Sequence, residues 1–191
     1  MTLKSKKAIG RPFLTLGKVD QFVRPFNEDG RAFIHQAADL VHKDSQSGAH
    51  AVVRPRHKFS RSKPTPAPEP VRVPLPPTIS HFVMNLPGSA TTVLHHFRGV
   101  YAGREKLFTP HTETMLPLVH VHCFAVKGSD EDAHADVLGR IEEETGVRLR
   151  VGENIDSGEV DIYDVRDVAP NKRMFCASFR VPPEVAFAAR E

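Results

Sequence analysis

The sequence has no long hydrophobic run and few cysteines. None of its apolar stretches approaches the roughly 20 residues that a membrane-spanning helix needs. The N-terminal segment MTLKSKK is basic, but no apolar region follows it, so it lacks the pattern of a secretory signal, and it is a poor match to a mitochondrial presequence. The two cysteines, Cys123 and Cys176, give no disulfide framework and favour a reducing compartment. These shortages argue against a helical membrane protein and a disulfide-rich secreted domain.

The chain is also short of net charge. Its 191 residues, enough for one domain, carry a formal charge of +3 and a sequence pI of about 9.0. That mild excess of positive charge is compatible with nucleic-acid binding without establishing it.

An apolar run at residues 79–84 ends at Asn85-Leu86-Pro87, and the chain is organised around this stretch. The run predicts a buried strand, which Pro87 would end because proline cannot continue the strand ladder. The Asn85 amide offers both a donor and an acceptor. Ligands of open α/β sheets bind outside the carboxyl ends of the strands, where this tripeptide would lie. The same tripeptide is also ordinary turn chemistry, so alone it leaves both interpretations open.

A helix with one buried face is predicted for residues 31–43, after a short strand at residues 19–23. Its apolar residues recur at helical spacing, namely Phe33, Ile34, Ala37, Ala38 and Val41. Asp29 lies at the turn between the two elements. Its carboxylate would either cap the helix or accept hydrogen bonds from a ligand at the same sheet edge as Asn85.

Helices and strands alternate in the rest of the chain. In chain order they are a helix capped at Ser89, a polar loop at residues 101–114, a strand at residues 116–126, a helix from Ser129 to Gly146, a short strand at residues 147–151, and strands at residues 160–168 and 174–181. The helix after Ser89 has an apolar stripe of Ala90, Val93, Leu94 and Phe97. Ser129 with Asp132 resembles a capping box, and Gly146 ends that helix. The last two strands predict an antiparallel hairpin.

The strand at residues 116–126 is apolar on both faces apart from His120 and His122, which indicates a central parallel strand, and we expect it to lie side by side with the strands at residues 19–23 and 79–84. The two histidines share one face, so a metal site has to be considered. Because no third ligand has a convincing spacing, we expect packed or hydrogen-bonded histidines and no metal.

Residues 45–77 differ from their surroundings. They contain half of the 16 prolines of the chain, and their six arginines and lysines face only Glu69 as an acidic residue. Such proline density predicts an extended, disordered basic insertion without helix or sheet. The insertion would either contact RNA phosphates or be a solvated loop without a role.

The order of elements predicts an α/β fold, the C-terminal half of a doubly wound sheet with an antiparallel edge. Three segments then resemble eukaryotic, fungal-like tRNA (guanine-37-N1)-methyltransferases: residues 25–34 (PFNEDGRAFI), residues 83–87 (VMNLP) and residues 165–182 (VRDVAPNKRMFCASFRVP). The third match is the longest and most specific. The resemblance covers residues 18–41 and 79–183 and leaves residues 1–17 unassigned.

This resemblance implies a class I, Rossmann-like fold that transfers a methyl group from S-adenosylmethionine to N1 of the guanine beside the anticodon. It implies that Asp29 and Gly30 hold the adenosine part of the donor. It also implies that Asn85 lies near both donor and guanine, with Pro87 shaping the turn. Arg166, Lys172 and Arg173 are the residues of the C-terminal hairpin that we expect to contact tRNA phosphates, although basic residues on a turn are usually solvated.

Nothing in residues 1–17 matches the first cofactor loop, the acidic residue for the donor ribose, or the family's proposed Arg and Glu for guanine activation. The chain therefore looks like a C-terminal fragment of the catalytic domain and is expected to be inactive alone. The alternative is a non-catalytic remnant that keeps RNA or protein contacts. An unrelated amino-methyltransferase is disfavoured by the hairpin motif. We expect a monomer that does not contact membranes, and the family allows cytoplasm, nucleus and mitochondrial matrix.

Overall fold

The structure is a computed structural model, and it describes residues 22–55, 66, 68–125, 128–169 and 172–190. The chain divides into two compact units. Met1–Gly30 and Leu40–Pro77 form the hairpin unit, and Arg31–Asp39 with Thr78–Glu191 form the sheet unit. None of the described helices is long and apolar enough to span a membrane.

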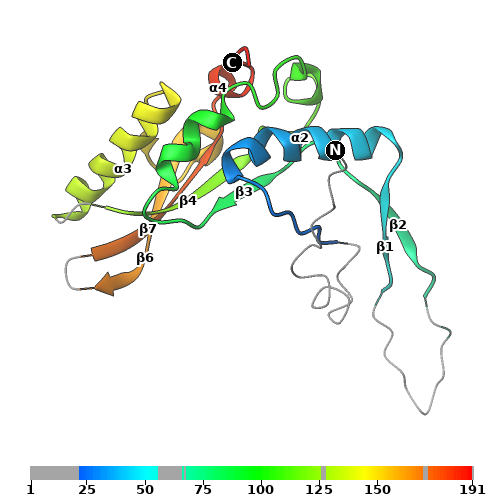
Figure 1. The fold of residues 1–191 in the computed structure, drawn as a ribbon, viewed down its shortest axis with the longest axis horizontal. Helices are drawn as coiled ribbons and strands as arrows, with labels where there is room; N and C mark the ends of the chain where they lie inside the picture. Colours follow the sequence, from blue (N-terminus) through cyan, green and yellow to red (C-terminus); the bar gives the residue numbers. More distant parts are fainter. Residues whose placement is uncertain (1–21, 56–65, 67, 126–127, 170–171, 191) are drawn as a thin grey trace, which may run out of the picture. The chain divides into compact units, whose positions relative to one another are not determined.

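The sheet unit is built on five strands in the order β3-β4-β7-β6-β5 (Figure 1). β3 is parallel to β4, β7 is antiparallel to both β4 and β6, and β5 is parallel to β6. The strands are β3 His81–Met84, β4 Leu118–Phe124, β5 Arg150–Val151, β6 Glu159–Ala169 and β7 Lys172–Arg180. This arrangement confirms the C-terminal hairpin and a parallel neighbour for the strand predicted at residues 116–126, whereas its other neighbour, β7, is antiparallel. The sheet fits part of a doubly wound α/β sheet.

One face of this sheet carries the hydrophobic core. Side chains alternate along β4, so that Val119, Val121 and Cys123 are fully buried while His120 and His122 point to the other face. The buried face packs with α3 (Asp130–Thr145) through Ala133, Val137 and Ile141. α3 begins at a Ser129–Asp132 capping box and ends at Gly146, whose φ of 72° is in the left-handed region that favours glycine, as predicted.

The segment after β3 is a 3-10 helix, η1 (Thr91–Phe97), and not the α-helix that its apolar stripe suggested. Its N-cap is Ala90 and not Ser89. The predicted buried face is nevertheless confirmed, because Leu94 and Phe97 are buried. The run of β-branched residues Thr91, Thr92 and Val93 loses side-chain freedom in an α-helix, which favours a short, tight turn instead.

Residues 101–114 were expected to form a polar loop, yet two of their rings are in the core. Tyr101 and Phe108 are buried edge to face with ring centroids 4.7 Å apart. The Tyr101 hydroxyl accepts a hydrogen bond from the backbone N–H of Ile79 at 2.9 Å, so burial raises the pKa of Tyr101 without leaving its polar atom unpaired. The loop is thereby fixed to the start of β3.

An ion-pair cluster around Asp39 joins the ends of the sheet unit. The Asp39 carboxylate accepts hydrogen bonds from Arg190 at 2.9 and 3.1 Å and from Arg104 at 2.6 Å. The Arg190 contact, followed by that of Arg104, lowers the pKa of Asp39. Arg190 also donates to the carbonyl of Gly99 at 3.1 Å. The Asp39 cluster therefore holds the C-terminal segment against both α2 and the turn at Gly99.

The helix α2 (Gly30–Gln46) is divided between the units, because Arg31–Asp39 belongs to the sheet unit and the rest to the hairpin unit. The hairpin unit also contains an antiparallel pair of strands, β1 (His50–Val53) and β2 (Val71–Pro74). α2 confirms the helix predicted for residues 31–43, with Ile34 and Ala38 buried on its apolar face. For the strand predicted at residues 19–23, the two described residues, Phe22 and Val23, are not in a strand, and the other three lie outside the described residues.

The prediction that residues 45–77 contain no helix or sheet is wrong at both ends. α2 continues to Gln46, and β1 pairs with β2 over four residue pairs from His50–Pro74 to Val53–Val71. The pairing is possible because β1 contains no proline, while Pro74 is the last residue of β2. Residues 56–65 and 67 lie outside the described part of the chain.

Candidate functional site

Asn85 directly follows the last residue of β3, at the edge where the parallel strands β3 and β4 both end. It is exposed, and the described residues provide no hydrogen-bond partner for its amide. The Pro87 carbonyl accepts a hydrogen bond from the backbone N–H of Phe124, the last residue of β4, at 3.1 Å. The Asn-Leu-Pro turn is thus anchored to the neighbouring strand, and the Asn85 amide is left available to a ligand.

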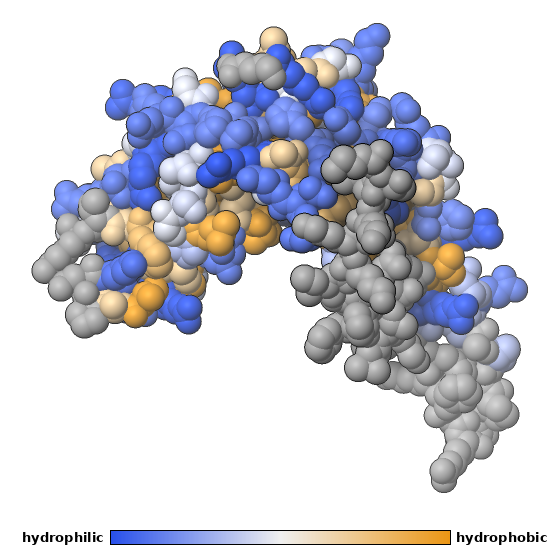
Figure 2. Space-filling view, in the orientation of Figure 1, coloured by the Kyte–Doolittle hydropathy of each residue, from blue (hydrophilic) through white to orange (hydrophobic). Residues whose placement is uncertain are grey.

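A second set of backbone contacts fixes the other side of the turn. The Leu86 carbonyl accepts from the N–H groups of Ser89 and Ala90, both at 2.8 Å. Figure 2 shows hydrophobic patches within a largely hydrophilic face, and the exposed apolar side chains include Val83 at 68% and Leu86 at 67%. The turn that carries Asn85 is therefore rigid in its backbone while presenting apolar surface beside the amide.

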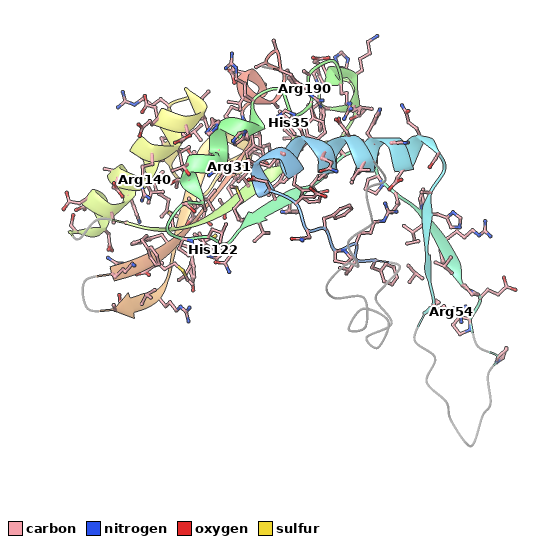
Figure 3. The ribbon with its side chains drawn as sticks, viewed as in Figure 1. Arg31, His35, Arg54, His122, Arg140 and Arg190 are labelled. Atoms are coloured by element: carbon pink, nitrogen blue, oxygen red, sulfur yellow. The ribbon has the colours of Figure 1, made fainter. Side chains whose placement is uncertain are left out.

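Arg140 supports the same edge and was not found from the sequence. Its guanidinium donates to the Phe124 carbonyl at 2.7 Å and to Asp136 at 2.7 Å, and Figure 3 shows it on α3. Its Nε is buried without a hydrogen-bond partner among the described residues. The Asp136–Arg140 spacing of four residues was the available signal, but such pairs on helices are usually no more than surface ion pairs.

The three residues of the β6–β7 hairpin that were expected to contact RNA differ in their surroundings. Arg173 pairs with Asp164 and, at 2.6 Å, with Asp130, and these carboxylates raise its pKa. The Lys172 ammonium lies 4.0 Å from the ring centroid of Phe124 at the candidate edge. Arg166 is exposed. Arg173 therefore links the β6–β7 hairpin to the start of α3. Arg166 and Lys172 are then better placed than Arg173 to contact a phosphate.

Asp29 immediately precedes Gly30, the first residue of α2, and both are exposed. They belong to the hairpin unit, whereas Asn85 and Pro87 belong to the sheet unit. Whether Asp29 and Gly30 share one pocket with Asn85 therefore stays a prediction.

The histidines on the open face of the sheet form a hydrogen-bonded chain. His81 Nδ1 lies 3.0 Å from His120 Nε2, and His120 Nδ1 lies 2.9 Å from the Ser178 hydroxyl. Burial, with His81 and His122 nearby, lowers the pKa of His120. In the described parts of the chain, no group of three or more metal-ligating side chains could hold a metal ion. The predicted hydrogen-bonded state of His120 is thus the one observed.

A cavity of about 500 Å³ lies at the other end of the same strands. It is lined by Leu116, which precedes β4, by Arg180 at the end of β7, and by Asp156, which pairs with Arg180. Since Asn85 follows the carboxyl end of β3, this cavity is separate from the candidate edge.

The strand order, the parallel β3–β4 pair and the turn at its carboxyl edge fit part of a Rossmann-like α/β sheet. The curated relatives agree. The chain is 60% identical over 173 residues to tRNA (guanine(37)-N(1))-methyltransferase of Fusarium vanettenii, covering 91% of this chain and 37% of that protein. It is 55% identical to the protein of the same name from Neurospora crassa, covering 91% of this chain and 36% of that one. It is 42% identical to the protein of the same name from Schizosaccharomyces pombe, covering 91% of this chain and 37% of that one.

These matches confirm the resemblance drawn from the three motifs. The chain spans a little over a third of the length of these relatives. No family model and no solved structure matches it.

Proposed function

We propose that this chain is the C-terminal part of the catalytic domain of a tRNA (guanine-37-N1)-methyltransferase. The observation that carries the proposal is Asn85, held at the carboxyl edge of β3 and β4 by the hydrogen bond between Pro87 and Phe124. It lies in a segment that is 60% identical to the Fusarium enzyme. Its amide would orient the edge of the target guanine, since an amide can both donate and accept a hydrogen bond.

The residues of the candidate edge fit S-adenosylmethionine in part. The unpaired Asn85 amide and the apolar Leu86 suit a polar nucleoside and a methyl group, and Asp29 with Gly30 would bind the adenosine end. The donor supplies the methyl group when it is bound. Displacement at that methyl group needs the guanine nitrogen aligned behind it, so positioning by Asn85 is the main contribution of this chain.

Guanine N1 carries a proton at neutral pH, so a general base is needed as well. Asn85 cannot serve as that base, and no carboxylate among the described residues of the sheet edge has a motif-based claim to the role. The proposal therefore assigns the base, the first cofactor loop and the ribose-binding acid to the part of the relatives that this chain does not span.

The first experiment measures donor binding and turnover of the 191-residue chain. Titration with S-adenosylmethionine by calorimetry should show no saturable micromolar binding, because losing several hydrogen bonds of about 1–3 kcal/mol each removes most of a micromolar affinity of about 8 kcal/mol. Methyl transfer to unmodified tRNA should also be absent. Micromolar binding with multiple turnovers would contradict the assignment of the missing groups.

The second experiment supplies those groups. The chain is fused to the N-terminal part of the Fusarium relative, and we expect methyl transfer to guanine 37 to appear. In that fusion, Asn85→Ala should lower turnover about 10²–10³-fold with little change in tRNA affinity, because one well-placed hydrogen bond is worth roughly 2–4 kcal/mol in the transition state. Asn154→Ala, which removes an amide from a loop near β5, is the matched control and should keep full turnover. A near-normal rate for Asn85→Ala would reduce the motif to a structural turn.

A second candidate function is a non-catalytic remnant that keeps RNA or protein contacts. The observation that favours it is the coverage of only about 37% of the Fusarium relative. A correctly folded fusion that binds tRNA and donor but does not transfer a methyl group would support the remnant.

A further inference from the structure

The arginines of the sheet unit are largely neutralised by carboxylates. Asp39 pairs with two of them, and four more have one or two acidic partners each, whereas Arg148 and Arg166 have no ion pair among the described residues. The arginines that form these ion pairs are Arg104, Arg140, Arg150, Arg173, Arg180 and Arg190. A paired guanidinium already has its charge compensated, so these residues contribute little field to a polyanion.

The β1–β2 hairpin has the opposite character. Arg54 directly follows β1, and Arg72 lies in β2 opposite Val52. Both are exposed, and neither has a carboxylate partner among the described residues. Figure 3 shows Arg54 at the end of β1. Within the described part of the chain, the guanidinium groups of Arg54 and Arg72 are therefore uncompensated.

The sequence between the strands adds charge of the same sign. From His50 to Pro74 the chain contains six arginines and lysines and one acidic residue, Glu69. Prolines flank the strands, which limits the freedom of the backbone and so lowers the entropy lost when an extended ligand binds.

The two faces of the hairpin also differ. By the alternation of side chains along a strand, His50, Val52, Arg72 and Pro74 share one face, while Ala51, Val53, Val71 and Val73 share the other. The three outer valines are 38%, 53% and 44% exposed, in the order Val53, Val71 and Val73. A ribbon with a basic face and an exposed apolar face can contact phosphates with one and sugars or bases with the other.

We propose that the β1–β2 hairpin is an RNA-binding arm, with Arg54 and Arg72 contacting backbone phosphates of tRNA. The choice of tRNA rests on the function proposed above. The contact is independent of nucleotide sequence, because phosphates carry no base information. It is separate from Asn85, so it would strengthen tRNA binding without taking part in methyl transfer.

The test uses the complete chain and an unmodified tRNA transcript with a fluorescent label, and measures binding by anisotropy over a series of salt concentrations. Each phosphate contact contributes about 0.7 to 0.9 to the slope of log K against log salt, so Arg54→Ala with Arg72→Ala should reduce the slope by about 1.4 to 1.8. At 0.1 M salt this corresponds to a loss of affinity of roughly 25-fold to 60-fold.

Two control variants isolate the arm. Arg54→Lys with Arg72→Lys keeps the charge and should keep most of the affinity. Lys106→Ala with Arg148→Ala removes the same charge from exposed positions of the sheet unit and should leave affinity and slope nearly unchanged. Circular dichroism should show the same fold for all variants, since Arg54 and Arg72 are exposed.

An unchanged slope for the alanine pair, or an equal loss for the sheet-unit control, would overturn the proposal. The proposal would also be overturned if the alanine pair lost binding to phosphatidylserine vesicles but kept binding to tRNA, because the arm would then bind a membrane surface. The fusion experiment tests the two proposals separately. If the fusion methylates guanine 37 and its arm variants bind tRNA normally, the proposed function stands and only the RNA-binding arm is refuted.

Discussion

The sheet unit and the β1–β2 hairpin use the same residue types for different purposes. Val119 and Val121 in β4 are 0% exposed, whereas Val53 and Val71 are 38% and 53% exposed. In the sheet unit, six arginines pair with acidic residues, while Arg54 and Arg72 in the hairpin unit have no carboxylate partner among the described residues. Five strands covered by α3 and η1 bury side chains on one face, whereas the two strands of the hairpin keep exposed valines. The difference indicates that stability resides in the sheet and that the hairpin is available for contacts with other molecules.

The largest loss of stability is expected when an aromatic ring is removed from the core of the sheet unit. Phe97→Ala should destabilise the protein by about 3–5 kcal/mol, because Phe97 is buried and packs edge to face with Phe82 at 4.9 Å. Urea denaturation measures the loss. Ile141→Val, expected to cost about 0.5–1.5 kcal/mol, provides a milder variant if Phe97→Ala does not fold. A cost below 1 kcal/mol for Phe97→Ala would mean that the core is loosely packed.

A smaller effect is expected from one hydrogen bond. Tyr101→Phe removes the hydroxyl that accepts from the Ile79 N–H, and it leaves that donor without its partner. An unpaired buried donor costs about 1–3 kcal/mol, while the volume of the ring hardly changes. The midpoint of thermal unfolding should fall accordingly. No fall would show that water replaces the hydroxyl and that the loop at residues 101–114 is not fixed through it.

Acid should weaken the sheet unit through His120. Its pKa is lowered in the folded protein, first by burial and then by His81 and His122, so the folded state binds fewer protons than the unfolded state. Stability is therefore complete above the ordinary histidine pKa of about 6.5 and decreases as the pH falls from there towards the lowered value. Unfolding measured between pH 7.5 and pH 5 should show this loss. The loss should shrink in His120→Gln, and an unchanged pH dependence would locate it at another residue such as His35, whose pKa is also lowered, mainly by burial.

The smallest effect is expected in the hairpin. Val73→Thr should change stability by no more than about 0.5 kcal/mol, because Val73 is exposed and a surface substitution removes little packing. Hydrogen exchange should correspondingly be fast for the β1 and β2 amides and slow for β4 and β7. Slow exchange in the hairpin would show that its strands are more stable than two exposed strands are expected to be.

Much of the sheet unit could be predicted because its local patterns agree with its tertiary contacts. Apolar runs separated by helical segments predicted the parallel pair β3 and β4, and the Ser129–Asp132 capping box predicted the start of α3. The resemblance in residues 165–182 and the strand pattern both predicted the hairpin of β6 and β7. At the candidate site, the apolar run and Pro87 predicted a strand that ends before Asn85, and β3 does end at Met84.

The errors arose where distant contacts decide the structure. Tyr101 is buried because its hydroxyl meets the backbone of Ile79, 22 residues earlier, which no local pattern reveals. The pairing of β1 with β2 was hidden by the prolines around both strands. Arg140 was missed because it supports the edge through a hydrogen bond to the carbonyl of Phe124, the last residue of β4. That contact exists only in the folded sheet.

The position of β7 has a consequence for synthesis of the protein. β7 lies between β4 and β6, although Lys172–Arg180 is the last strand in the chain. During translation the β3–β4 pair and the β5–β6 pair can form before β7, but nothing joins them until β7 has left the ribosome. The hydrogen-bonding edge of β4 therefore remains open from the synthesis of Phe124 until β7 emerges, and that of β6 for a shorter time, and such edges bind other strands readily. A chain interrupted before β7 would leave two separate strand pairs and no continuous sheet.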